Sequence, residues 1–194
     1  MRAAARCGRG RTKNVSSVFG HLDHVLCVLI LISRLGDIGT TYFVTPNLVL
    51  EANPVVRKLG WRFALLTLTA CFVPYLSIGA GLMILVPSLM VSASNASKVW
   101  VARTMGEREY HAFLLRVAAA SKLRTAIACL LVSAAFIVLL GAVLVALYPD
   151  PTRDYGYWFG AGIVAYGVVL VFHGSLALVR LFKQVTLVES SHRR

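Results

Sequence analysis

The sequence predicts an all-α, polytopic membrane protein: a bundle of four transmembrane helices with an amphipathic helical loop on the cytoplasmic side. The chain of 194 residues is 58% hydrophobic and 14% charged, with a mean hydropathy of +0.73, which is too apolar for an ordinary soluble domain. Four apolar runs are each long enough to cross a hydrocarbon core about 30 Å thick as a helix. Helices are expected because they pair their own backbone groups inside lipid.

The chain is expected to comprise a basic tail over residues 1–20, a transmembrane domain over residues 21–183 and a second tail over residues 184–194. Pro74 and Pro87 fall within the second helix, and each removes an amide donor and crowds the preceding turn. We therefore expect this longest helix to bend rather than to run straight. The four spanning helices are predicted at about residues 22–44, 63–91, 125–147 and 157–182.

The segment between the second and third helices mixes aromatic and basic side chains. Trp100, Tyr110 and Phe113 stand among lysines and arginines over residues 92–122. This mixture is typical of a helix that lies in the membrane interface, where aromatic rings serve as anchors. The amphipathic loop of the predicted fold is placed here.

The last predicted helix carries a helix-packing pattern. Gly156 and Gly160 are spaced as GxxxG, and Gly162 and Gly167 follow them. Small residues at such spacings let a second helix backbone approach closely. The pattern predicts contact with another helix, and a second copy of the chain or a partner membrane protein is a candidate for supplying it.

The distribution of the 20 Lys and Arg predicts the orientation. With four crossings, fifteen of them fall in the two tails and residues 92–124, four fall in the other two loops, and Arg34 lies within the first helix. Cytoplasmic loops carry an excess of basic residues, so both termini and the long loop are expected in the cytoplasm of a multi-pass cell-membrane protein. The net charge of +12 is not gathered with aromatic or polar readers on one module, so no nucleic-acid partner is expected.

The N-terminal tail and the cysteines bear on the compartment. The first 20 residues contain several arginines and no acid. No small-residue cleavage site follows the first apolar run, so a retained helix is expected, and an organellar transit peptide stays open as the alternative.

Cys27, Cys71 and Cys129 fall in separate helices without a CxxC pair, and Cys7 lies in the tail. All four are expected to be reduced packing residues.

Charged side chains interrupt the first apolar run. Arg34 and Asp37 are three residues apart and therefore share one helical face. One interpretation is an intramembrane ion pair, in which each charge reduces the cost of placing the other in hydrocarbon. This interpretation requires no ligand.

A polar site at the outer end of the same helix is the second interpretation. Asp37 and the threonines after it project from nearly the same side, and the following loop adds an acid and an amide before Pro54. Hard oxygen ligands of this kind suit a cation or a polar substrate group, so a divalent cation is a candidate, while the metal and the cofactor stay unassigned. The candidate residues are Asp37, Thr40, Thr41, Glu51, Asn53 and, from the last helix, His173.

His173 is included because of its expected depth. At about 1.5 Å per helical residue, it lies within about 6 Å of the depth of Asp37. The two side chains are expected to meet if the first and last helices are neighbours. A hydrogen-bonded packing residue is the other interpretation of His173.

Part of this stretch resembles a family of small prokaryotic membrane proteins of unknown function. That family is marked by an Asp-x-x-Thr first helix, a following loop similar to Glu-Ala-Asn-Pro and often a His in the final helix, which here correspond to Asp37, Thr40, residues 51–54 and His173. The resemblance covers about a fifth of the chain, mainly residues 29–63. Members are often shorter, with three helices and a Lys in the second helix. The second predicted helix of this chain has no Lys. The family has no established activity, so the resemblance implies a shared polar cluster and no reaction.

Three classes of function are consistent with the sequence. The leading one is a membrane protein with a structural, binding or accessory role, because no HExxH, GxSxG or phosphate-binding glycine loop is present. The second is a membrane-embedded enzyme or cation-binding protein that uses the polar site. The third is a protomer of an oligomeric transporter, since four helices rarely enclose a path alone. Whether the chain is an enzyme is left open.

Overall fold

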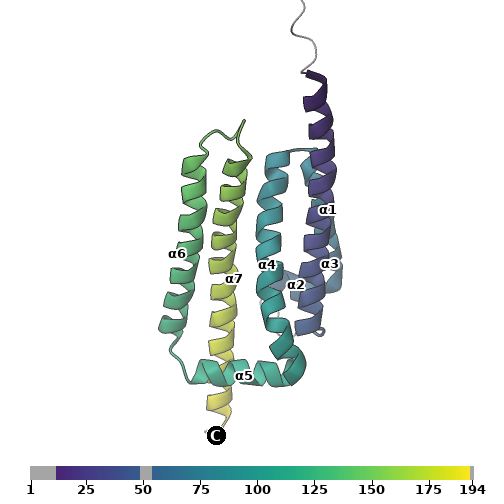
Figure 1. Ribbon diagram of the computed structural model, residues 1–194. Coiled ribbons are helices and arrows are strands. Elements are labelled where there is room, and N and C mark those ends of the chain that lie inside the picture. Colours follow the sequence, from purple (N-terminus) through teal and green to yellow (C-terminus); the bar gives the residue numbers. More distant parts are fainter. Residues whose placement is uncertain (1–11, 49–53, 193–194) are drawn as a thin grey trace, which may run out of the picture.

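The computed structural model describes residues 12–48 and 54–192, and every regular element within these ranges is a helix (Figure 1). The prediction of an all-α protein is therefore confirmed. Four helices are long and apolar enough to cross a membrane, at His21–Val44, Ile78–Met105, Leu123–Leu147 and Tyr155–Leu187. The elements are α1 (Thr12–Val44), α2 (Pro54–Leu59), α3 (Trp61–Leu66), the 3-10 helix η1 (Thr67–Tyr75), α4 (Ile78–Met105), α5 (Glu107–Ala119), α6 (Leu123–Leu147) and α7 (Tyr155–His192).

The bundle consists of two groups of helices that meet at α4. On one side α6 packs along α7, and on the other α1 packs along α4 and η1. Contacts between α4 and α7 join the two groups, while α5 lies across one end of the bundle and contacts α4 and α7 (Figure 1). α4 therefore forms the common wall between the first and last helices.

The helix predicted over residues 63–91 is divided in the structure. Its first part belongs to α3 and η1 and its second to α4, and the chain reverses direction between Tyr75 and Ile78 (Figure 1). Pro74 has no amide hydrogen to continue the helical pattern, and Ser77 begins α4 by accepting a hydrogen bond from the amide of Ala80 at 3.3 Å. The expected bend is thus a full reversal.

Gly81 allows this reversal to be tight. A methyl group built at Gly81 would lie 2.9 Å from the Cγ atom of Pro74, which is closer than real carbon atoms approach. The absence of a side chain lets the first turn of α4 pack directly on the end of η1. Sequence apolarity is continuous across this point, so hydropathy alone does not reveal the turn.

α2, α3 and η1 return the chain along α1 to the end at which α1 begins. A 3-10 helix rises about 2.0 Å per residue, compared with 1.5 Å for an α-helix. The nine residues of η1 therefore span a greater length than nine residues of an α-helix would. Thr67 and Thr69 donate their hydroxyls to the carbonyls of Ala64 and Leu66, at 2.6 and 2.8 Å. These bonds tie both threonine side chains back to the preceding turn of the chain.

This return bears on the expected orientation. α1 and α4 run in the same direction, so the described N-terminal end of α1 and the C-terminal end of α7 lie at opposite ends of the bundle (Figure 1). The expectation that both termini share one compartment assumed four crossings, and it stays a prediction. α5 and the C-terminal end of α7 lie at the same end, as expected for the long loop and the C-terminal tail.

The glycines of α7 are used for packing within the chain. A methyl group at Gly160 would lie 2.8 Å from the carbonyl oxygen of Gly141 on α6, and one at Gly162 would lie 3.0 Å from Val86 on α4. Gly156 faces Tyr148, and Gly167 faces Val138 on α6. The chain itself thus supplies the helices that pack on these glycines. The glycines therefore give no support to the expectation of a protein partner, which stays a prediction.

Candidate functional site

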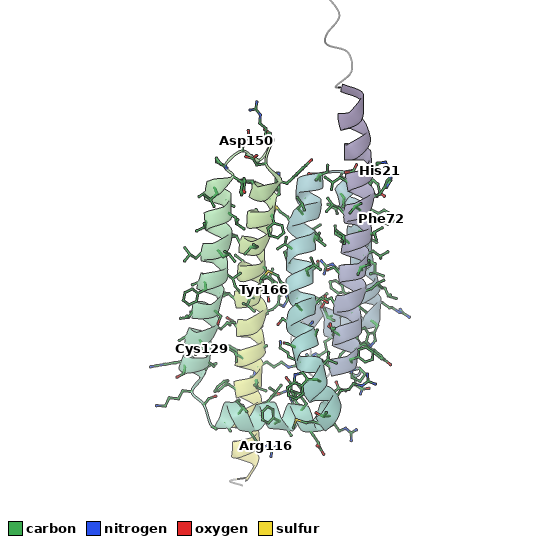
Figure 2. The ribbon with its side chains drawn as sticks, viewed as in Figure 1. His21, Phe72, Arg116, Cys129, Asp150 and Tyr166 are labelled. Atoms are coloured by element: carbon green, nitrogen blue, oxygen red, sulfur yellow. The ribbon has the colours of Figure 1, made fainter. Side chains whose placement is uncertain are left out.

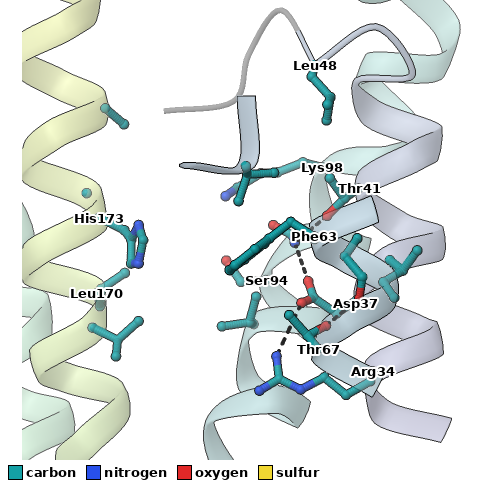
Figure 3. A pocket seen from close by; sticks show the side chains of 18 of the residues that line it. Arg34, Asp37, Thr41, Leu48, Phe63, Thr67, Ser94, Lys98, Leu170 and His173 are labelled. Atoms are coloured by element: carbon teal, nitrogen blue, oxygen red, sulfur yellow. Dashed lines mark hydrogen bonds and ion pairs between the residues drawn. The ribbon is translucent and has the colours of Figure 1, made fainter. Parts of the chain in front are cut away.

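A half-open cleft of about 500 Å³ lies beside α4, between the first and last helices (Figure 3). Each long helix contributes residues spaced three or four apart, which places them on one helical face. The lining residues are Arg34, Asp37, Ile38 and Thr41 of α1, Leu48, Val56 of α2, Trp61, Phe63 and Ala64 of α3, Thr67 of η1, Val91, Ser94, Asn95 and Lys98 of α4, and Tyr166, Val169, Leu170, His173, Gly174 and Ala177 of α7.

Asp37 is at the centre of the polar wall. Its carboxylate accepts a hydrogen bond from the Asn95 amide at 3.0 Å and lies 3.9 Å from the Arg34 guanidinium. Asn95 also donates to the hydroxyl of Thr41 at 3.3 Å. Asn95 therefore ties α4 to two positions of α1 and orients the acid toward the cleft.

Among the described residues, two cations give this wall a positive excess: Arg34 and Lys98 line the cleft, against the carboxylate of Asp37. The Nε atom of Arg34 is buried and has no hydrogen-bond partner among the described residues. A charged donor without a partner is costly in an apolar region, so the wall has hydrogen-bonding capacity beyond its internal contacts.

α7 provides the opposite wall, which is largely apolar. Val169, Leu170 and Ala177 line it, and His173 is its polar side chain, on the far side of the cleft from Asp37 and Arg34 in Figure 3. The ring of His173 packs edge-on against Phe172 at 5.4 Å. Among the described residues His173 has no hydrogen-bond partner, and it faces Asp37 across the cleft.

Aromatic residues close the cleft near the loop that follows α1. The Trp61 indole donates to the carbonyl of Pro46 at 3.3 Å, and its ring lies 5.5 Å from that of Tyr42. These contacts hold the start of α3 against the end of α1. Trp61 itself lines the cleft and so presents a large apolar surface next to the polar wall.

A second polar cluster holds the end of α1 to the start of α5. The carboxylate of Glu107 accepts hydrogen bonds from the Thr45 hydroxyl at 2.5 Å and from the side-chain amide of Asn47 at 2.8 Å. Arg103 packs over the ring of Phe43 at 4.8 Å in the same region. The cluster fixes the corner between α4 and α5 below the cleft.

Only some of the predicted site residues line the cleft. Asp37, Thr41 and His173 line one cleft. Thr40 does not, because its hydroxyl donates to the backbone carbonyls of Gly36 and Asp37 in its own helix at 2.8 and 3.1 Å. Glu51 and Asn53 lie outside the described residues, so their placement remains a prediction.

Sequence reasoning missed the contribution of α4. Ser94, Asn95 and Lys98 belong to the polar end of the predicted second helix, and they were assigned to the interface because that helix was expected to end near residue 91. α4 instead continues to Met105. A signal was present in the spacing of Asn95 and Lys98 by three residues, which places an amide and an ammonium group on one face.

The described residues form no recognisable metal site, and the chain has no match among known proteins. Within residues 12–48 and 54–192, no group of three or more His, Cys, Asp or Glu is arranged to hold a metal ion. No protein-family model, curated protein or solved structure matches the chain. The functional argument therefore depends on the cleft itself.

Proposed function

We propose that the chain is a multi-pass membrane protein that binds an amphiphilic ligand with an anionic polar group in the cleft beside α4. The observation that carries this proposal is the division of the cleft into two walls. Arg34, Asp37, Asn95 and Lys98 form a polar wall with a positive excess, and α7 forms an apolar one. A ligand with one charged end and one hydrocarbon end satisfies both.

The size and the access of the cleft support the same ligand class. A volume of about 500 Å³ falls within the usual range of about 300–1,000 Å³ for small-molecule sites. α7 contacts α4 and α6, whereas α1 and η1 contact the other side of α4. The cleft thus lies between two helix groups, where a lipid-soluble molecule is able to enter sideways from the bilayer.

In this proposal, Lys98 and Arg34 bind the anionic group of the ligand. Lys98 is exposed and forms no ion pair with another described residue, while Arg34 shares its charge with Asp37. An anionic head group placed between them would supply an acceptor for the buried Nε atom of Arg34. Tail atoms would then contact Trp61 and the α7 wall.

Thermal unfolding in phosphatidylcholine nanodiscs tests this proposal. Dodecyl phosphate should raise the unfolding temperature, and dodecanol and dodecyltrimethylammonium should not, because only the first carries the required charge. Lys98→Gln should weaken the dodecyl phosphate effect about tenfold in apparent affinity, which corresponds to about 1.4 kcal/mol. Lys183→Gln is the matched control, since it removes an exposed lysine of α7 that does not line the cleft.

Other outcomes of this experiment favour other functions. Equal stabilisation by all three amphiphiles, or an unchanged response in Lys98→Gln, would refute recognition of an anionic group. Stabilisation by Mg²⁺, Ca²⁺, Mn²⁺ or Zn²⁺ that Asp37→Asn abolishes would favour the cation-binding alternative instead. A structural or accessory role alone predicts no response to any of these probes.

We further propose that the end of the bundle with α5 faces the cytoplasm of the cell. Eleven of the 20 Lys and Arg fall between residues 57 and 183 on segments at or toward this end, whereas Arg153 is in the loop at the opposite end. Basic residues accumulate on the cytoplasmic side of membrane proteins. The proposal places the N-terminal end of α1 on the outer side.

A further inference from the structure

Basic side chains from three long helices line the cleft. Arg34 belongs to α1, Lys98 to α4 and His173 to α7. In Figure 3 the ammonium group of Lys98 extends from α4 toward the α7 wall, and the imidazole of His173 extends from α7 into the same space. Nitrogen donors therefore border the cleft on both of its walls.

His173 is unusual because it is exposed deep within an apolar span. It is 18 residues after Tyr155 and 14 before Leu187, which are about 27 and 21 Å along the helix from the two ends of that span. Figure 2 shows Tyr166 near the middle of α7, and His173 follows two turns later on the same face. An ionisable side chain at such a depth is costly unless it meets a polar group, so it is a candidate for ligand binding.

The backbone beside His173 is held by close packing. A methyl group at the adjacent Gly174 would lie 2.8 Å from the side chain of Leu130 on α6. On the same helix, one at Gly162 would lie 3.0 Å from Val86 on α4. α7 thus has little freedom to move, and its imidazole is presented to the cleft from a fixed backbone position.

The facing wall has donors that its internal contacts do not use. Nη1 of Arg34 faces Asp37 at 3.9 Å, while its buried Nε atom has no hydrogen-bond partner among the described residues. Lys98 is exposed and forms no ion pair with another described residue. The carboxylate of Asp37 opposes a second anion, and the two cations outweigh it. Donors on α1, α4 and α7 are therefore left for one ligand.

We propose that the head group of the ligand is a terminal phosphate, held between Arg34, Lys98 and His173. This inference rests on the proposed binding of an anionic amphiphile in the cleft. A phosphate monoester carries three unsubstituted oxygens in a tetrahedral arrangement, so it presents acceptors toward three helices at once. The ligand class is then a lipid phosphate monoester.

The number of oxygens separates this class from other anionic lipids. A carboxylate has two oxygens in one plane, and the phosphate of an ordinary phospholipid is a diester with two unsubstituted oxygens. Either group leaves one of the three directions without an acceptor, and an unpaired donor in an apolar region is costly. His173 is thus the residue that determines specificity, because it supplies the donor from the α7 wall.

Apparent affinities of the full chain in phosphatidylcholine nanodiscs test this inference, measured by thermal unfolding at about pH 8, where a phosphate monoester is a dianion. The ligands are dodecyl phosphate, its methyl ester and dodecanoate, with dodecanol as the uncharged reference. Dodecyl phosphate should bind at least about tenfold more tightly than either other anion. All three anions should bind more tightly than dodecanol.

Substitutions at His173 test its role. His173→Phe keeps a ring and removes the N–H donor, so it should weaken dodecyl phosphate binding about tenfold and leave dodecanoate binding unchanged. His173→Asn keeps an N–H donor and should retain part of the preference for phosphate. Phe172→Leu is the matched control, because Phe172 is the neighbouring ring on α7 and does not line the cleft. It should leave both affinities unchanged.

Each contrary outcome overturns a different part. Equal affinities for dodecyl phosphate and dodecanoate in the wild type would refute a terminal phosphate and leave the proposed function standing. Equal affinities for dodecyl phosphate and its methyl ester would point to a phosphate diester instead. A full preference for phosphate in His173→Phe would remove this residue from the site. Anions that bind no better than dodecanol would overturn the proposed function and this inference together.

Discussion

At the scale of single residues, the polar groups inside the bundle are held by a few specific partners. Asn95 contacts both Asp37 and Thr41, and it is the hydrogen-bond link between α4 and α1 at the cleft. Arg34 contributes an ion pair at the longer distance of 3.9 Å. The amide, rather than the arginine alone, therefore orients the carboxylate.

Asn95→Ala should lower the free energy of unfolding by roughly 1–3 kcal/mol, because it removes donors to a charged acceptor and to a hydroxyl. Reversible unfolding in mixed micelles, followed by helical circular dichroism, measures this change. Ser97→Ala is the control: its exposed hydroxyl bonds only to the carbonyl of Ser94 in the same helix. Equal effects of the two substitutions would contradict the role assigned to Asn95.

The turn before α7 contains an acid whose ionised form is stabilised. The Thr152 hydroxyl and, after it, the Thr152 amide donate to Asp150 at 2.6 and 2.9 Å and lower the pKa of this carboxyl below its usual range. Asp150 lies in the loop outside the spanning helices. Because the folded pKa is lowered, the stabilisation is present above the ordinary value of about 3.9 and is lost as the pH falls through the folded pKa.

Exchange of the Thr152 amide hydrogen measures this dependence. Protection should persist below pH 4 and then decline, and Thr152→Val should move the decline to higher pH, since it removes the hydroxyl donor. A wild-type decline centred above the ordinary pKa of aspartate would contradict the assignment.

At the scale of elements, close contact between helix backbones holds α6 and α7 together. Gly141 and Gly160 face each other, and a side chain at either would meet the backbone of the opposite helix. Packing of this kind stabilises helix pairs in lipid, where burial of apolar surface offers little gain. η1 returns the chain along α1 within the bundle, and the hydroxyls of Thr67 and Thr69 at its start donate to carbonyls of α3.

Gly160→Ala should destabilise the protein by about 1–3 kcal/mol, since the added methyl group pushes α7 away from α6. Gly39→Ala is the matched control on α1, where a methyl group meets nothing within 4 Å. It should leave stability unchanged or raise it by about 0.5–1 kcal/mol through lower flexibility of the unfolded chain. Unfolding in mixed micelles compares the two, and a tolerated Gly160→Ala would show that α6 and α7 pack less closely.

At the scale of the whole molecule, the return of the chain through α2, α3 and η1 determines which ends face each other. With this return, the start of α1 shares one end of the bundle with the loop that contains Asp150, and α5 shares the other with the end of α7 (Figures 1 and 2).

Cysteine labelling in intact cells tests this arrangement. In a chain whose native cysteines are replaced by Ser, Arg153→Cys should react with a membrane-impermeant maleimide from outside, and Arg108→Cys should react only after the membrane is opened. A tag at the N-terminus should be accessible from outside and one at the C-terminus should not. Both tags on the inner side would restore the four-crossing topology expected from hydropathy.

The sequence by itself determined the helical class, the four long apolar helices and the presence of unusual charges at Arg34 and Asp37. These properties depend on composition and on local spacing, which hydropathy and helical periodicity report directly. Asp37, Thr41 and His173 were selected as candidates for the same reason. Asn95 and Lys98 were not, because their role depends on where the second apolar run is divided.

Only the tertiary structure decided that division, the packing of the α7 glycines inside the chain and the hydrogen bond from Asn95 to Asp37. A reversal between Pro74 and Ser77 leaves average apolarity unchanged, so no hydropathy profile distinguishes one bent helix from two antiparallel segments. The choice depends on whether Gly81 packs against Pro74 and whether η1 packs along α1. These are contacts between residues brought together by folding, and their energies are not encoded in any single stretch of sequence.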